Sequence, residues 1–148
     1  MPSLPAVVTV QNVSAAAMGA LLLTSAVNHF RNPGFYRQVV PSYLCREDTA
    51  AQRPLAVLSR EEWIAASGLL ELGAAAGILV PATRKFTATG LAAMYTAFLA
   101  GHVDALQRAY GPKGTPEQRK VHTIRLPFQL PLIAWAWSLR KPGRSAAA

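Results

Sequence analysis

The sequence predicts an all-α protein: a four-helix antiparallel bundle that spans a membrane. Four apolar runs separated by polar connections divide the 148 residues. Hydrophobic residues make up 51% of the chain and charged residues only 15%, below the ~25% of an ordinary soluble domain. This length predicts a single domain over residues 1–148. The expected spans are about 10–30, 63–80, 86–102 and 126–139.

The first run extends from Val10 to Phe30, with an apolar body from Val13 to Val27. No Lys or Arg precedes Arg31. A secretory signal peptide carries positive charge before its apolar stretch. We therefore expect this run to be a span that stays in the protein.

The second run, Trp63 to Val80, is the most informative segment. Its only charged residue is Glu71, near the middle. A surface helix of a soluble protein has a polar face, but this segment is apolar and small on every side. Such a helix is surrounded by lipid or by other helices. The alternative, a soluble bundle of very apolar helices, fits this segment poorly.

The third and fourth runs complete the bundle. Residues 81–85 predict a tight turn, so that the second and third helices form an antiparallel hairpin. The fourth run, 126–139, is the weakest, because Pro127 and Pro131 interrupt it. We expect Pro127 in a first helical turn, where proline is tolerated, and a kink at Pro131. The tail, residues 142–148, is expected to be disordered.

The charge of the chain belongs to its connections. The net charge is +8, and the Lys and Arg residues avoid the apolar runs. No basic stripe alternates with aromatic residues and no nucleic-acid motif is present, so nucleic acid is not expected as a partner. We expect the lipid bilayer as partner and a multi-pass position in the cell membrane. The two long loops, 31–62 and 103–125, carry most of the positive charge, which favours a cytoplasmic location for them.

A candidate pocket follows from the antiparallel topology. The end of the first helix, the start of the second, the end of the third and the start of the fourth meet at one face, where most polar residues of the spans lie. A carboxylate inside an apolar span is costly and by default suggests a functional site. We therefore predict a polar pocket around Glu71. The candidate ligand-binding residues are Asn28, His29, Ser67, Glu71, His102, Arg125 and Gln129.

Each candidate also has a structural explanation. Glu71 is compatible with a carboxylate that pairs with Arg125 or a histidine, or with a neutral carboxyl bonded to Ser67. Arg125 is compatible with an interfacial anchor. The sequence contains no recognised metal-ligand spacing, so no metal is expected. The lone Cys45 excludes an internal disulfide. No motif identifies a cofactor or a catalytic residue.

Several short motifs together carry a family resemblance. They are His29-Phe30, Pro33, Tyr36, Val40-Pro41, Ser67-Gly68, Glu71, Gly73, Gly77, Leu79 to Pro81, Arg84, and Arg125 with Gln129. Over about residues 15–140 the chain resembles the DoxX-like family of small four-helix integral membrane proteins. It departs from the family at residues 101–104, where relatives often carry a Pro-Ala-Asn-like element.

The resemblance implies one DoxX-like multi-pass membrane domain. The family is named for a subunit resembling part of a thiosulfate:quinone oxidoreductase, and other relatives act as membrane assembly factors. The leading hypothesis is a redox-associated subunit that binds a quinone-like or other lipophilic molecule in the pocket around Glu71. The alternatives are a non-catalytic accessory or assembly factor for another membrane protein and a small-molecule transporter.

Overall fold

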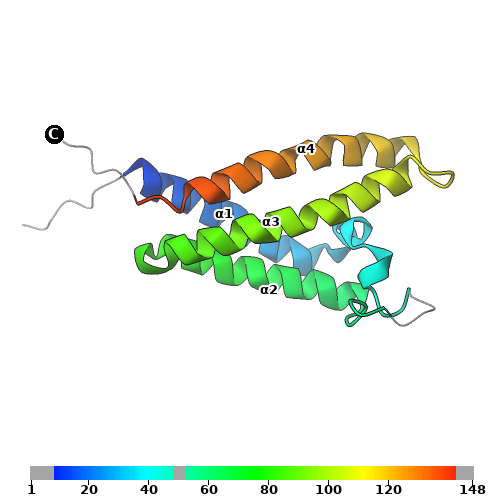
Figure 1. The fold of residues 1–148 in the computed structure, drawn as a ribbon, viewed down its shortest axis with the longest axis horizontal. Coiled ribbons are helices and arrows are strands. Elements are labelled where there is room, and N and C mark those ends of the chain that lie inside the picture. The colour runs from blue at the N-terminus through cyan, green and yellow to red at the C-terminus, as the bar shows by residue number, and fades with distance from the viewer. Residues whose placement is uncertain (1–8, 49–52, 143–148) are drawn as a thin grey trace, which may run out of the picture.

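The protein is all-helical in the residues that the structure describes, 9–48 and 53–142. The computed structural model contains four long helices (Figure 1): α1 Val10–Arg31, α2 Arg60–Leu79, α3 Pro81–Ala109 and α4 Pro116–Ser138. The predicted all-α class is confirmed. Most of the predicted disordered tail, residues 143–148, lies outside the described part of the chain.

The helices alternate in direction around the bundle (Figure 1). The helix α1 packs on α2 and α3 packs on α4, while α2 and α3 form a hairpin. The start of α1 and the end of α4 meet, because the Gln11 side chain donates to the carbonyl oxygens of Ser138 and Lys141, at 3.2 and 2.9 Å. The loop between α1 and α2 therefore lies at the opposite end of the bundle.

Helix starts are set by local capping. Ser59 caps α2 through a reciprocal pair of hydrogen bonds with Glu62, and Thr115 caps α4 in the same way with Gln118. In each pair the two side chains accept from two backbone N–H groups that the first turn would otherwise leave free. Pro81 lies at the first position of α3, where its missing N–H costs nothing.

The predicted bounds of the last two helices were wrong. The helix α3 begins at Pro81, so the predicted turn at 81–85 is helical and only Val80 separates α2 from α3. The helix α4 begins at Pro116, ten residues before the predicted start, and continues through Pro127 and Pro131. The predicted helix ends were placed where charged residues begin, but a charged residue does not terminate a helix. The capping box at Thr115 was the signal that sequence reasoning missed.

The loop between α1 and α2 holds three short 3₁₀ helices, Pro33–Phe35, Arg37–Val39 and Ser42–Leu44. Arg60 holds this loop in place, because its guanidinium donates to the carbonyl oxygens of Val40 and Arg37, at 2.6 and 2.8 Å, and pairs with Asp48. The Trp63 indole donates to the Leu44 carbonyl at 2.7 Å. These bonds fix the loop over the end of the bundle.

The apolar core fills the other half of the bundle, away from that loop. Its buried residues include Met18, Leu22, Ile78 and Leu91. Glycine permits one close helix contact there: a Cβ at Gly77 would lie 2.5 Å from the Thr87 hydroxyl of α3.

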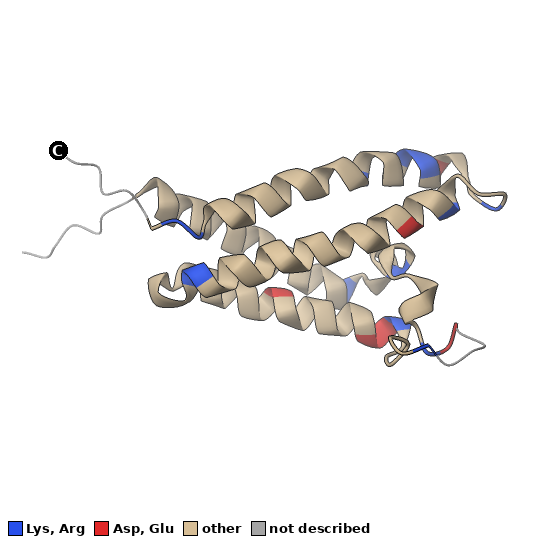
Figure 2. Cartoon of the chain, in the orientation of Figure 1, with Lys and Arg blue, Asp and Glu red and all other residues tan. Residues whose placement is uncertain are grey.

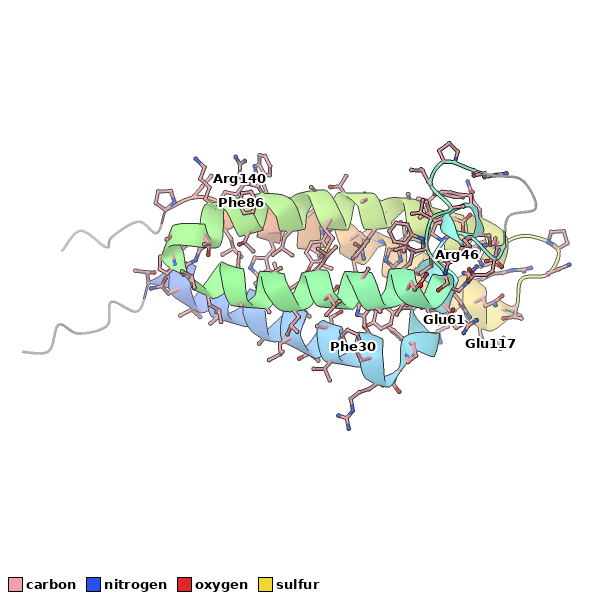
Figure 3. The ribbon with its side chains drawn as sticks, turned by 90° about the horizontal axis from the view of Figure 1, so that it is seen from below. Phe30, Arg46, Glu61, Phe86, Glu117 and Arg140 are labelled. Carbon is pink, nitrogen blue, oxygen red and sulfur yellow. The ribbon has the colours of Figure 1, made fainter. Side chains whose placement is uncertain are left out.

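Charge and apolar surface are segregated along the bundle. Figure 2 shows the Lys, Arg, Asp and Glu residues mainly toward its two ends, with one acidic position along α2. Large apolar side chains are exposed along the helices, including Leu70, Phe128 and Phe86, which is 85% exposed. In Figure 3, Phe30 lies on α1, Phe86 and Arg140 lie toward the end of the bundle away from the loop, and Arg46 and Glu61 lie at the loop end.

Two of the four helices, α1 and α2, are long and apolar enough to cross a membrane by length and composition. In each, 28% of the most apolar window is buried inside the molecule. The helices α3 and α4 do not meet the same criterion within the described residues.

Candidate functional site

A cavity of about 440 Å³ lies beneath the loop between α1 and α2, within the loop half of the bundle. All four long helices and the loop line it, mostly with aliphatic and aromatic side chains. The polar lining contains six of the seven residues predicted as a site: His29, Ser67, Glu71, His102, Arg125 and Gln129. Their role in ligand binding stays a prediction.

Asn28 is the predicted residue that does not line this cavity. Its amide nitrogen donates to the Tyr36 hydroxyl at 3.1 Å. The Tyr36 ring stacks on the His29 ring with centroids 3.6 Å apart, and its hydroxyl donates to the Ser25 carbonyl at 3.2 Å. Asn28 thus helps to hold Tyr36, which in turn covers His29.

One side of the cavity, the α1–α2 wall, carries the pair His29 and Glu71. The Nδ1 atom of His29 lies 3.5 Å from Oε2 of Glu71 and 2.9 Å from the Ser25 carbonyl oxygen. The two residues are only 5% and 4% exposed. Glu71 Oε2 has no hydrogen-bond partner within the described residues.

Gly68 allows this pair to form. It lies one turn before Glu71 on α2, and a Cβ there would lie 2.8 Å from the His29 Cβ and 3.0 Å from the Phe30 ring. Only a glycine lets α1 approach α2 this closely. The pair therefore depends on a backbone contact as well as on its own side chains.

Two structural explanations for Glu71 do not fit. The Ser67 hydroxyl donates to the Ile64 carbonyl at 2.9 Å, within its own helix, and no hydrogen bond joins it to Glu71. Arg125 forms no ion pair with Glu71 either, since the described ion pair of Glu71 is with His29. Pairing with a histidine is the explanation that the geometry retains.

The opposite side, the α3–α4 wall, carries the pair His102 and Gln129. The amide nitrogen of Gln129 lies 2.9 Å from His102 Nε2, and both residues are buried. If the amide donates, Nε2 accepts and the histidine proton lies on Nδ1. His102 Nδ1 and Gln129 Oε1 have no hydrogen-bond partners within the described residues. This wall thus also contains buried polar atoms without a hydrogen-bond partner in the described residues.

Arg125 lies near the roof of the cavity. Its guanidinium carbon is 4.3 Å from the centre of the Phe35 ring, within the range of a cation–π contact. It is half-buried.

Two further residues lie outside the cavity. The buried Cys45 thiol donates to the Pro41 carbonyl at 3.4 Å, and burial raises its pKa, which favours the protonated thiol over the thiolate. His122, expected in a loop, lies in α4 and bonds Gln38 Oε1 at 2.8 Å. No group of three or more His, Cys, Asp or Glu residues in the described ranges is placed to hold a metal ion.

Sequence reasoning missed several aromatic residues of the cavity. Tyr95, Phe98 and Trp63 all line it. Tyr95 lies seven residues before His102, two turns earlier on the same face of α3, so helical spacing was an available signal. Tyr36 belongs to an irregular loop, and no periodicity places a loop residue against His29.

Comparison with known proteins gives one match. No curated protein and no solved structure matches the chain. A family model described as a domain of unknown function, DUF8561, matches residues 18–140. This match does not test the resemblance to DoxX-like proteins, which stays a prediction. Because the matched region covers most of the sequence, the chain belongs to the DUF8561 family.

Proposed function

We propose that this protein is a multi-pass protein of the cell membrane and a redox-associated subunit whose cavity binds a quinone-like or other lipophilic small molecule. The resemblance to DoxX-like proteins supports this proposal, because that family consists of four-helix integral membrane proteins. The support from the molecule itself has two parts: the apolar exterior and the chemistry of the cavity.

The exterior favours a membrane. About seven-tenths of each apolar window in α1 and α2 is not buried within the molecule, since the buried share is 28%. A helix with no polar face needs an apolar surrounding. Residues 86–103 of α3 and 126–139 of α4 contain no Lys, Arg, Asp or Glu, and at ~1.5 Å per residue these stretches are ~27 and ~21 Å long. Glu71 is therefore the only Lys, Arg, Asp or Glu residue in the apolar stretches of the four helices.

The cavity favours a small lipophilic ligand. Ligand sites are typically ~300–1,000 Å³, mostly apolar, with a few convergent polar groups, and this cavity has all three properties. The observation that carries the proposal is that buried polar atoms of three lining residues, Glu71, His102 and Gln129, have no hydrogen-bond partner in the described part of the chain. Such atoms in a folded protein require a partner.

A quinone ring suits two such walls. Its two carbonyl oxygens lie on opposite sides of the ring, and the two histidine pairs come from opposite helix pairs. Full reduction takes up two electrons and two protons. Here the chain supplies hydrogen bonds and, at His29 and Glu71, a group that exchanges a proton. The electrons come from a redox partner protein, because the sequence carries no flavin, haem or iron–sulfur ligand motif.

The membrane part is tested by fractionation. The protein is expected to stay in the membrane pellet after alkaline carbonate washing. Release into the supernatant contradicts the proposal.

The ligand part is tested by fluorescence. Trp63 lines the cavity, so a short-chain benzoquinone added to the protein in mild non-ionic detergent should quench its emission. The variant Trp63→Phe should lose this saturable component. Substitution of Glu71, His29 and His102 together should abolish saturation. Unchanged quinone binding in that variant contradicts the proposal that these three residues bind the quinone.

The second candidate is a non-catalytic accessory protein that stabilises another membrane protein. The observation that favours it is the outer face of α2, where Gly73 has open space around it and Leu69 is exposed. This function predicts a defined partner in mild detergent and retained activity after Glu71→Gln. A protein that purifies without a partner but with a bound lipophilic molecule argues against it.

A further inference from the structure

Arg125 differs from the other inward-facing arginines in what it contacts. Arg84 donates to the carbonyl oxygens of Ile78 and Leu79 and to the Asn12 side chain. Arg60 donates to loop carbonyls and pairs with Asp48. Arg125, although half-buried, has no hydrogen bond or ion pair within the described residues, and its guanidinium lies over the face of Phe35. Arg125 lines the cavity.

The chain offers Arg125 no acidic partner. All seven Asp and Glu residues of the sequence lie in the described part of the chain. Five are held elsewhere: Glu61 by Arg37, Glu62 by Arg46, Asp48 by Arg60, Asp104 by Arg108, and Glu47 by the Arg60 backbone N–H. Glu71 faces His29, and Glu117 lies in the first turn of α4. The negative charge that would balance Arg125 therefore comes from outside the chain.

The guanidinium of Arg125 restricts which negatively charged group can pair with it. Charged groups away from water are normally paired. A guanidinium binds a carboxylate or a phosphate through two parallel hydrogen bonds. Along α4 after Arg125 the lining continues with the apolar Phe128 and Leu132 and the amide of Gln129. Leu70 and Phe128 line the cavity and are each 63% exposed, so the cavity reaches the apolar outer surface of the bundle.

We propose that the ligand of this cavity is an amphiphile with an anionic head, a carboxylate or a phosphate, that Arg125 binds while the apolar chain extends along the cavity toward Leu70 and Phe128. This inference rests on the proposed function, because it names the class of the lipophilic ligand. The head group has two sources, a fatty-acid-type carboxylate and a lipid phosphate.

The experiment compares three brominated probes of equal chain length on the purified protein in non-ionic detergent. They are 11-bromoundecanoate, its methyl ester and 11-bromoundecyl phosphate. Isothermal titration calorimetry in the same detergent measures the affinity of each probe, and quenching of Trp63 emission by bromine is a second readout. At least one anionic probe is expected to bind about tenfold or more tightly than the ester, the range of one charge-assisted hydrogen bond. Tighter binding of the carboxylate indicates a fatty-acid-type ligand, and tighter binding of the phosphate indicates a lipid phosphate.

Arg125→Gln tests the residue. The ratio of anion to ester affinity should fall about tenfold in this variant, and Arg125→Lys should restore part of it. Comparing ratios within one detergent removes differences in micelle partition. Arg119→Gln is the matched control, because Arg119 also lies on α4 and over an aromatic ring, Tyr110, but does not line the cavity. It should leave the ratio unchanged.

The outcomes separate the two proposals. Equal affinity for anion and ester in the wild-type chain overturns the inference without any variant. If benzoquinone still quenches Trp63 in that case, the cavity binds a neutral ligand and the proposed function stands. If no probe and no quinone binds, both fail. An anion preference that survives Arg125→Gln also overturns the assignment to Arg125.

Discussion

The two histidines of the cavity have different partners. On the α1–α2 wall, His29 faces the carboxyl group of Glu71; on the α3–α4 wall, His102 faces the amide of Gln129. A histidine and a carboxyl group can exchange a proton, whereas an amide does not titrate and only donates or accepts hydrogen bonds. We therefore expect proton transfer to a ligand at the α1–α2 wall. The α3–α4 wall orients the ligand.

The largest expected effect is on the α1–α2 wall. Glu71→Lys places an ammonium group beside His29, in a cavity that already holds the Arg125 cation. An uncompensated buried charge costs roughly 3–5 kcal/mol. We expect loss of folded protein in detergent, measured as monodisperse yield and thermal unfolding.

Glu71→Gln is the control for that change. It keeps the shape and removes the ionisable group, and we expect a change in stability of about 1 kcal/mol or less. If Gln is as harmful as Lys, the ionised carboxylate holds the bundle together, and Glu71 is then a structural residue.

The second prediction concerns the close contact behind the same wall. Gly68→Ala puts a methyl group 2.8 Å from the His29 Cβ, and overpacking of this kind costs about 1–3 kcal/mol. Gly90→Ala is the matched control, because Gly90 also lies inside a helix but has nothing within 4 Å of an added Cβ. There the alanine should stabilise by about 0.5–1 kcal/mol. Thermal unfolding of both variants should move in opposite directions; a shared direction contradicts the packing argument.

This contrast shows how far the sequence predicts the site. Apolar runs placed the four helices, and antiparallel topology brought residues from all four to one cavity. The contact at Gly68 was not predictable, because its reason is the position of His29 on another helix. The spacing of residues within one helix does not show which glycine contacts a side chain of another helix. The Glu71 partner was left open between Arg125 and a histidine for the same reason.

The α3–α4 wall gives the third prediction. Gln129→Leu leaves the buried His102 Nε2 without its hydrogen bond, and we expect a loss of about 1–2 kcal/mol. The double variant His102→Phe with Gln129→Leu removes both partners and should lose less than the sum of the two single changes. Thermal unfolding of the four proteins measures this coupling. Additive losses mean that the pair contributes no mutual stabilisation.

The smallest expected effect belongs to the third histidine, His122, which lies outside both walls and serves as their reference. Burial, and then the positive charges of Arg125 and Arg108, lower its pKa below the ordinary value of 6.5. As pH falls below 6.5, His122 binds a proton in the unfolded chain but not yet in the folded protein, so the free energy of unfolding decreases with acidification. His122→Gln removes this proton-binding difference and should flatten the fall of the unfolding temperature between about pH 7.5 and pH 5.5, the window around the ordinary histidine pKa. Any slope that remains belongs to other titrating groups, the cavity histidines among them. A steeper fall in His122→Gln would mean that His122 gains a proton on folding, opposite to the direction its burial dictates.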